Sequence, residues 1–273
     1  MATARYAHPD HLGYRISAGT THALLLPGFM GTPHEMRPLA DALAAAGVSA
    51  RSVLLPGFGP DYARLAASSA EDWIAAAAAA WREERDAASR AVLIGFSMGA
   101  AIAAAVAARG GAPDELILLA PHIRMADRRA VALPLLKLLM REFKPFANAD
   151  FNDPGIRSTF SEMAPDADLD DPAVQRQLRE ETSIPTRALD ELRRAGVIAN
   201  REAPRVSAPA LIVQGEQDQT SLPAFSREFA RRLGGPHRYQ PVPGGHMLVD
   251  PAHPGWEITR EAVVRAAAGE HAP

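Results

Sequence analysis

Short apolar runs of strand length alternate along this chain with longer segments in which apolar residues recur at helical spacing. The runs predicted as strands are 22–27, 48–56, 91–96, 115–120, 210–215 and 237–242. The segments predicted as helices are 33–47, 72–88, 98–110, 224–233 and 256–268. Strands that are apolar throughout, alternating with helices, are typical of a parallel sheet covered on both faces. The pattern therefore predicts an α/β fold with a mostly parallel sheet.

Local signals mark where two of these helices begin and end. The helix predicted over 33–47 has Pro33 in its first turn and Gly47 just past its end, which is the usual placement of these residue types. Ser68 and Glu71 have the spacing of a capping box ahead of the long alanine-rich helix. We therefore expect Ser68 to cap the N-terminus of that helix.

The alternation breaks after Pro121. From 122 to 205 the chain shows helical stretches and loops rich in proline and aspartate, without a convincing buried strand. A chain of 273 residues in this class often forms one domain. We therefore expect a core made of 1–121 and 206–273, interrupted by a helical insertion over 122–205.

Composition and charge exclude several classes of function. The chain has 29 lysines and arginines against 32 acids and no basic block, so no nucleic-acid partner is expected. It has no cysteine, which rules out disulfides, thiolate metal sites and thiol nucleophiles. Tyr62 stands where a dinucleotide loop needs its third glycine, and Pro38 stands where the zinc pattern H-E-x-x-H needs its second histidine. We expect neither a cofactor nor a metal.

Nothing in the sequence predicts stable membrane insertion. The most apolar segment, 130–140, is far shorter than the roughly 20 residues that span a bilayer, and it contains Pro134 and Lys137. We expect it to be a helix packed on the protein itself, with a lipid-facing lid helix as the alternative. The N-terminus lacks the patterns of a signal peptide and of lipidation, so a cytoplasmic protein is expected. The oligomeric state stays open, a homodimer included.

The sequence GFSMG places Ser97 between an apolar strand and a helix of small residues. Gly95 and Gly99 flank it two residues away on either side, where side chains would collide if the backbone made a sharp turn. Such a turn pushes the serine oxygen out above the strand ends. The strand, turn and helix context favours a nucleophile over a chance match to G-x-S-x-G.

A serine nucleophile needs a base and a group that orients the base. Asp218 follows the strand predicted at 210–215, and His246 follows the last short strand in a glycine-rich turn, so the order Ser97, Asp218, His246 suits this topology. The competing assignments are weaker because of their positions in the chain. The acids Glu216 and Asp127 compete for the orienting role, and the other histidines are His8, His11, His22, His34, His122, His237, His253 and His271.

An anionic tetrahedral intermediate needs backbone N–H donors. The amide of Met98 lies at a helix N-terminus, where N–H groups lack intrahelical partners and the dipole favours negative charge. The second donor should come from the glycine-rich loop PGFMGTP, and Phe29 N–H is the expected one. Residues 27–32 are called the oxyanion loop below.

Nearly the whole chain resembles the α/β-hydrolase family, and within it the carboxylesterases and monoacylglycerol lipases. The matching segments are LLLPGFMGTPHEMRPLADALAAAG, LLPGFGP, EDWIAA, GFSMGA, GEQDQT and GGHMLVD. The resemblance implies Ser97 as nucleophile, His246 as base and Asp218 as its orienter, and it implies that 122–205 is a cap. Two positions depart from the pattern. Pro27 and Phe58 stand where that group usually has histidines, and Pro27 removes both an N–H and a polar side chain that help to hold the oxyanion loop.

The resemblance implies a serine hydrolase that cleaves small-molecule carboxylic esters through an acyl-enzyme. The apolar cap residues suit an acyl or aromatic pocket, so we expect short to medium acyl chains. The same triad could serve a thioester, a lactone, a carbon–carbon bond or a monoacylglycerol. A hydrolase-shaped binding protein without turnover is the alternative from another class, and Pro27 is the feature that favours it.

Overall fold

The computed structural model describes residue 6 and residues 8–153, 156–157, 160 and 168–270. Most of the N-terminal stretch and several residues of the predicted insertion lie outside this part of the chain. The chain divides into two compact units. The first is formed by Met1–Asp127 together with Glu191–Pro273, and the second by Arg128–Asp190.

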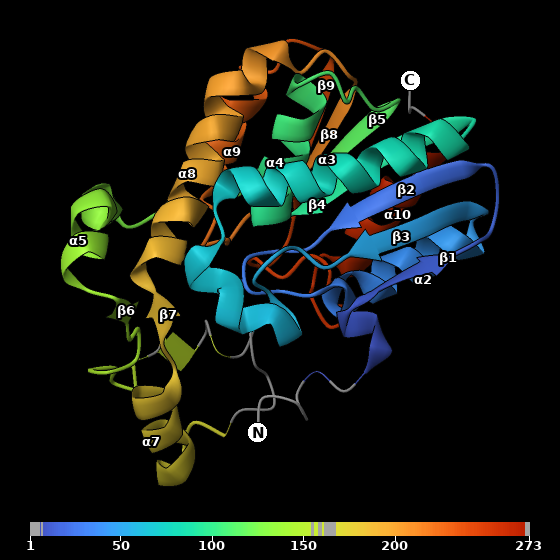
Figure 1. Ribbon diagram of the computed structural model, residues 1–273. Coiled ribbons are helices and arrows are strands. Elements are labelled where there is room, and N and C mark those ends of the chain that lie inside the picture. The colour runs from blue at the N-terminus through green and yellow to red at the C-terminus, as the bar shows by residue number, and fades with distance from the viewer. Residues whose placement is uncertain (1–5, 7, 154–155, 158–159, 161–167, 271–273) are drawn as a thin grey trace. The chain divides into compact units, whose positions relative to one another are not determined.

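The first unit contains a seven-stranded sheet with the order β1-β3-β2-β4-β5-β8-β9 (Figure 1). Its strands are β1 (Gly13–Ile16), β2 (Thr21–Leu26), β3 (Val48–Val53), β4 (Arg90–Phe96), β5 (Glu115–Leu119), β8 (Ala210–Gly215) and β9 (His237–Val242). All pairs are parallel except β1 with β3. The mostly parallel sheet predicted from the sequence is confirmed. The antiparallel edge strand β1 was not predicted, because its four residues carry too little apolar pattern.

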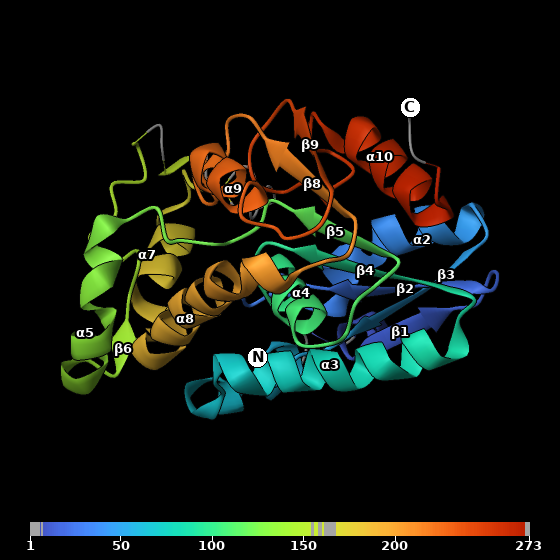
Figure 2. The same ribbon diagram turned by 90° about the horizontal axis from the view of Figure 1, so that it is seen from above.

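Helices cover both faces of this sheet, as the alternation predicts. Figure 2 shows α2 (Arg37–Ala45) and α10 (Trp256–Ala268) on one side and α3 (Ala70–Ala87) and α4 (Met98–Ala108) on the other. The shorter elements of this unit are η1 (Pro9–His11), η2 (Pro33–Met36), η3 (Gly59–Ala67), η5 (Ala203–Arg205) and α9 (Pro223–Ala230).

Two helix starts differ from the prediction by small shifts. The segment predicted as one helix over 33–47 is a 3-10 turn, η2, followed by α2, because Pro38 near the start of α2 has no N–H to continue the earlier bonds. The capping box of α3 is formed by Ser69 and Asp72, whose side chains bond each other's backbone N–H groups. Ser68, the predicted cap, instead donates its hydroxyl to the Arg64 carbonyl.

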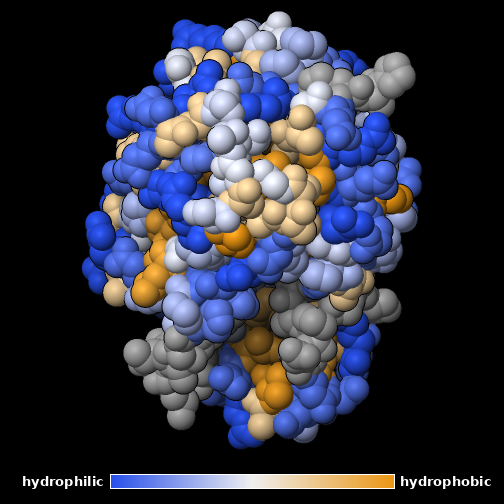
Figure 3. Space-filling model, turned by 90° about the vertical axis from the view of Figure 1, so that its right-hand side faces the viewer, coloured by the Kyte–Doolittle hydropathy of each residue, from blue (hydrophilic) through white to orange (hydrophobic). Residues whose placement is uncertain are grey.

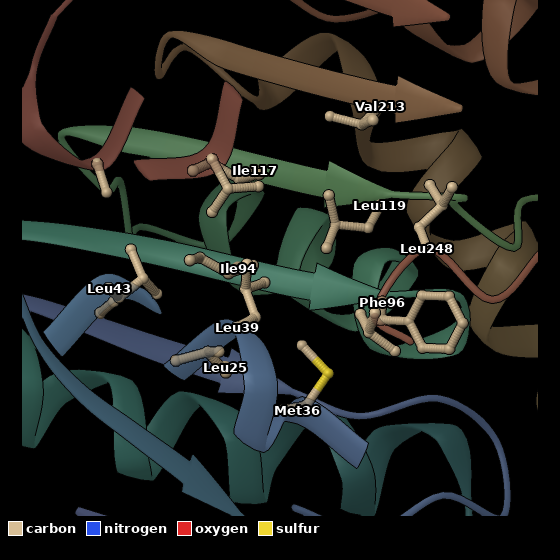
Figure 4. Close-up of a cluster of buried hydrophobic side chains, with 14 of the residues drawn as sticks. Leu25, Met36, Leu39, Leu43, Ile94, Phe96, Ile117, Leu119, Val213 and Leu248 are labelled. Carbon is tan, nitrogen blue, oxygen red and sulfur yellow. The ribbon is translucent and has the colours of Figure 1, made fainter. Parts of the chain in front are cut away.

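The core under α2 and α10 shows the period of two that strands impose. Alternate residues of β2, β4, β5 and β8 point to this face and pack against the two helices. Figure 4 shows Leu25, Ile94, Phe96, Ile117, Leu119, Val213 and Leu248 packed with Met36, Leu39 and Leu43. Phe96 is the last residue of β4, so the core fixes the strand directly before Ser97.

The second unit is small and has its own apolar cluster of Phe151, Phe160 and Leu169. Its elements are η4 (Arg128–Ala132), α5 (Leu133–Leu139), β6 (Glu142–Phe143), α7 (Pro172–Glu181), β7 (Ile184–Pro185) and the first residues of α8 (Thr186–Glu202). The unit is shorter at both ends than the insertion expected over 122–205. The reason is that Gly196 in α8 lies against the backbone of His122 and Ile123, which draws both flanking segments into the first unit.

No helix among the described residues is both long and apolar enough to cross a membrane. The face shown in Figure 3 is mostly hydrophilic, with hydrophobic residues in separate patches. Single exposed apolar residues are ordinary on protein surfaces. Six of the large apolar residues described in the second unit are exposed: Val131, Leu135, Leu138, Leu139, Met140 and Phe143.

Glu84 of α3 ties that helix to three strands of the sheet. Its side chain, 1% exposed, accepts hydrogen bonds from Arg15 on β1 and Arg51 on β3 and contacts His22 on β2. Burial alone would raise the pKa of Glu84, but the bonds from the two arginines outweigh burial and hold its pKa below the usual value.

We expect Glu84→Gln to lower the free energy of unfolding by about 3 kcal/mol near neutral pH, because two guanidinium groups lose a buried partner. Since the folded protein lowers the pKa of Glu84, this stabilisation is present above the pKa of the unfolded chain and is lost as pH falls. The difference between the two proteins in urea denaturation should therefore shrink at acidic pH. Glu83→Gln is the matched control, because Glu83 is exposed and contacts Arg51 alone among these groups.

Candidate active site

Ser97 occupies a strained turn between β4 and α4. Its backbone has φ 54° and ψ −115°, a conformation that residues other than glycine rarely adopt. Two backbone bonds hold it there: Ser97 N–H donates to the Leu119 carbonyl at 2.9 Å, and the Ser97 carbonyl accepts from His122 N–H at 3.0 Å. The strain persists because β5 and the loop after it fix both sides of the residue.

The two glycines beside Ser97 are required by close backbone contacts. A Cβ at Gly95 would lie 2.3 Å from the Gly99 carbonyl oxygen, and one at Gly99 would lie 2.2 Å from the Leu26 oxygen. Any side chain at either position would force the helix away from the strand or from the oxyanion loop. The first turn of α4 is thus packed directly against the start of that loop.

The structure brings the three predicted residues together. Asp218 lies in the loop after β8, and His246 lies in the loop after β9. His246 Nε2 is 3.0 Å from Ser97 Oγ, and His246 Nδ1 is 2.8 Å from Asp218 Oδ2. All three side chains are buried or nearly so. This arrangement allows the imidazole to take a proton from the hydroxyl while the carboxylate holds the ring.

Asp218 is held as a hydrogen-bond acceptor on both oxygens. Oδ1 accepts from the backbone N–H groups of Thr220 and Ser221, each at 2.8 Å, and Oδ2 accepts from Gln214 Nε2 at 2.9 Å. An acceptor facing His246 Nδ1 favours the tautomer that carries its proton there, which leaves Nε2 able to accept from Ser97. The competing acid Glu216 is exposed to solvent.

His122, whose place before Asp218 in the chain argued against a role as the base, is a buried neighbour of this site. Burial, with a smaller contribution from His246, lowers the pKa of His122 to about 4, and Asp218 opposes this shift only in part. His122 is therefore neutral at physiological pH. In the sequence, the position of His122 shortly after β5, at the edge where the strands end, was the feature that could have placed it near the site.

The oxyanion loop begins with a tight turn over Gly28–Gly31. Gly31 N–H donates to the Gly28 carbonyl at 3.2 Å, and Met30, the third residue of the turn, has φ 60°. A positive φ at this position is the mark of a type II turn, where glycine is usual. Among the backbone hydrogen bonds of the described residues, none is donated by the amides of Phe29 or Met98. Both predicted donors are therefore available to a bound oxyanion.

The two departures from the family pattern have structural counterparts. Phe58 is fully buried, and its ring lies 5.7 Å from that of Phe29 and 5.3 Å from that of Trp73. Trp73 is in turn anchored, since its Nε1 donates to the Pro56 carbonyl at 2.9 Å. An aromatic cluster therefore packs on the side chain of Phe29. Pro27 has no N–H with which to hold the start of the oxyanion loop. The N–H of the next residue, Gly28, holds it instead by donating a hydrogen bond to Glu35 on η2.

One group of side chains has the residue types of a metal site. Ligand atoms of His8, Asp10 and His34 lie within 4.8 Å of one another. However, Arg37 Nη1 donates to Asp10 Oδ2 at 2.8 Å. The guanidinium group supplies the positive charge that an ion would otherwise bring to this carboxylate, so we do not assign a metal here.

Comparison with known proteins gives consistent matches. A family model described as serine aminopeptidase, S33, matches residues 21–247. The thermostable monoacylglycerol lipase of Bacillus sp. (strain H-257) is 27% identical over 205 residues, which cover 75% of this chain and 73% of that protein. A solved structure from work on LipS and LipT, two metagenome-derived lipolytic enzymes, has a TM-score of 0.75 at 23% identity and covers 96% of this chain and 98% of its own. The monoacylglycerol lipase of Paleococcus ferrophilus has a TM-score of 0.69 at 19% identity, over 95% and 99% of the two chains.

We expect Gly99→Ala to destabilise the protein by about 3 kcal/mol, because the new methyl group overlaps the Leu26 and Pro27 carbonyl oxygens. The displaced helix should also slow the labelling of Ser97 by a fluorophosphonate, which mass spectrometry measures. Gly110→Ala is the control. Gly110 has φ 95° but open space around it, so its replacement should cost only about 1 kcal/mol of strain and leave labelling unchanged.

Proposed function

We propose that this chain hydrolyses carboxylic esters at Ser97. It belongs to the α/β-hydrolase family, as its sequence led us to expect, and the family model that it matches is described as serine aminopeptidase, S33. The observation that carries this proposal is the hydrogen-bonded chain from Ser97 Oγ through His246 to Asp218, at 3.0 and 2.8 Å. The lipase names of the Bacillus and Paleococcus relatives support esters over other acyl compounds.

The proposed reaction has two halves. Ser97 Oγ attacks the ester carbonyl carbon while its proton passes to His246 Nε2, and the tetrahedral intermediate then expels the alcohol, which takes that proton. Water attacks the acyl-enzyme in the same way, so the acid leaves and Ser97 is restored. The N–H groups of Phe29 and Met98 would stabilise the oxyanion in both halves, and one such donor is typically worth about 3 kcal/mol.

The substrate class is proposed to be esters of short to medium acyl chains, monoacylglycerols included. The second unit supports this choice, because it exposes several large apolar side chains, among them Leu135, Leu138 and Leu139 of α5. We propose that this unit is the cap expected from the sequence and that it selects the acyl group. The family description leaves an aminopeptidase as the second candidate.

Replacement of Ser97 by alanine should abolish ester hydrolysis while leaving the fold intact, because no other group replaces the nucleophile. Initial rates with a chromogenic ester and circular dichroism measure the two effects. A fluorophosphonate should add one label to the wild-type chain, mapped to the peptide that contains Ser97. A Ser97→Ala variant that retains near-native turnover would remove the nucleophile assignment, whereas a wild-type chain that neither cleaves the ester nor takes the label would favour a binding protein.

A substrate panel should separate the candidate activities. We expect the highest kcat/KM on esters of short to medium acyl chains, and little cleavage of aminoacyl anilides, because ester alcohols leave more easily than amines. Thioester, lactone and diketone substrates tested alongside would identify the other activities that this triad could support. A maximum on acetate or on very long acyl chains would contradict the proposed preference.

A further inference from the structure

The carboxyl group of Glu35 lies inside the curve of the oxyanion loop. Gly28 N–H donates to its Oε1, and a Cβ at Gly31 would lie within 2.3–2.5 Å of the carboxyl atoms. The two glycines at the ends of the turn thus leave just enough room for this one side chain. Glu35 reaches back from η2, seven residues after the amide that it holds.

The Glu35 side chain is partly buried, and its carboxyl group has no ionic partner among the described residues. Burial raises the pKa of Glu35 and the bond from Gly28 offsets only part of that rise, so that the pKa is about 7. The oxyanion loop has no titratable side chain, and β4 contributes Phe96, which lies against Gly28. The charged neighbours on its own segment are engaged elsewhere: the His34 ring packs on those of His8 and His11, and Arg37 bonds Asp10 and Asp41. The desolvation of this carboxyl group destabilises its charged form, so its presence here points to a role other than folding.

The bond to Gly28 fixes the direction of the next amide. The Gly28 carbonyl is held inside the turn by Gly31 N–H. Because the C=O and N–H of one peptide unit point in opposite directions, the Phe29 N–H is directed out of the turn. With the peptide before Gly28 held by Glu35 and the peptide after it held by Gly31, the Phe29 N–H cannot rotate freely.

We infer that Glu35 is a positioning residue, which holds the Gly28 amide and thereby orients the Phe29 N–H toward the oxyanion. The inference rests on the proposed function. Pro27 has no N–H, so the first amide of the loop that a side chain can hold is that of Gly28. Phe96 contacts Gly28 and also lies 5.2 Å from the His246 ring, so the loop, the glutamate and the base belong to one packed group.

Two substitutions separate the hydrogen bond from simple packing. Glu35→Gln keeps an acceptor for Gly28 N–H, whereas Glu35→Met keeps the volume and removes the acceptor. We expect the methionine variant to lose at least about tenfold in kcat on a chromogenic ester with KM little changed, and the glutamine variant to recover most of that loss. Asp41→Asn is the matched control, an exposed carboxylate on the next helix, and it should retain wild-type kcat.

The pH profile supplies a readout that a packing role would not move. An ionised acceptor holds an N–H more strongly than a neutral one, so the ratio of wild-type to Glu35→Gln kcat should rise as pH increases through about 7. Taking the ratio removes the contribution of His246, which both proteins share. The ratio of wild type to Asp41→Asn should stay flat.

Stability against pH tests whether the carboxyl group is buried as described. Because folding raises the pKa of Glu35 from 4.5 to about 7, the folded state favours its neutral form, and the protein loses stability as pH rises through that range. The unfolding temperature of Glu35→Gln should therefore rise relative to that of the wild type as pH increases from 5 to about 8.

Three results would overturn the inference while leaving the proposed function in place. They are full kcat in an active Glu35→Met enzyme, a flat ratio of wild-type to Glu35→Gln kcat across pH, and an unfolding temperature difference that does not change with pH. Failure of the proposed function would look different, because the wild-type chain would then neither cleave esters nor take the fluorophosphonate at Ser97.

Discussion

The backbone at Ser97 is the constraint on which the other features of the site depend. A φ of 54° costs of order 1–3 kcal/mol for a residue with a side chain, and the chain retains it because β5 and His122 bond both sides of the residue. The turn is also crowded, since Gly95 and Gly99 meet neighbouring carbonyl groups without space for a methyl group. It follows that β4, α4 and the oxyanion loop form one closely packed body, and that the turn sets the direction of Ser97 Oγ toward His246.

Burial acts differently on the polar groups gathered around this body. Asp218 accepts from Gln214, Thr220, Ser221 and His246, so its charge is surrounded by donors. Among the described residues, Glu35 and His122 have no comparable set of partners, and desolvation raises the pKa of Glu35 and lowers that of His122, which favours the neutral form of each. The site therefore surrounds the carboxylate beside His246 with donors, whereas desolvation shifts the two neighbouring ionisable groups toward their neutral forms.

Much of this arrangement could be predicted from the sequence, because it depends on patterns within short segments of the chain. Buried strands appear as apolar runs, and the loops that follow them carry Ser97, Asp218 and His246, so the order along the chain was enough to select three residues. Competition between equal local signals was harder to resolve. Ser68 with Glu71 and Ser69 with Asp72 have the same spacing. Ser69 forms the cap, because the Ser68 hydroxyl donates its hydrogen bond to the Arg64 carbonyl. The boundaries of the second unit depend likewise on the packing of Gly196 against His122, which no pattern reveals.

Glu35 shows why a functional side chain can be overlooked in a motif that was inspected for another chemistry. In the sequence, His34 and Glu35 open a failed zinc pattern, and Pro27 is a missing histidine. The structure joins the two observations, since the glutamate bonds the amide that follows the proline. The proposed nucleophile, acid and base come from three distant segments of the chain, and the sheet is what brings them together. The oxyanion loop and its anchor lie within one short segment, so the geometry of the Phe29 donor is encoded almost entirely between Pro27 and Glu35.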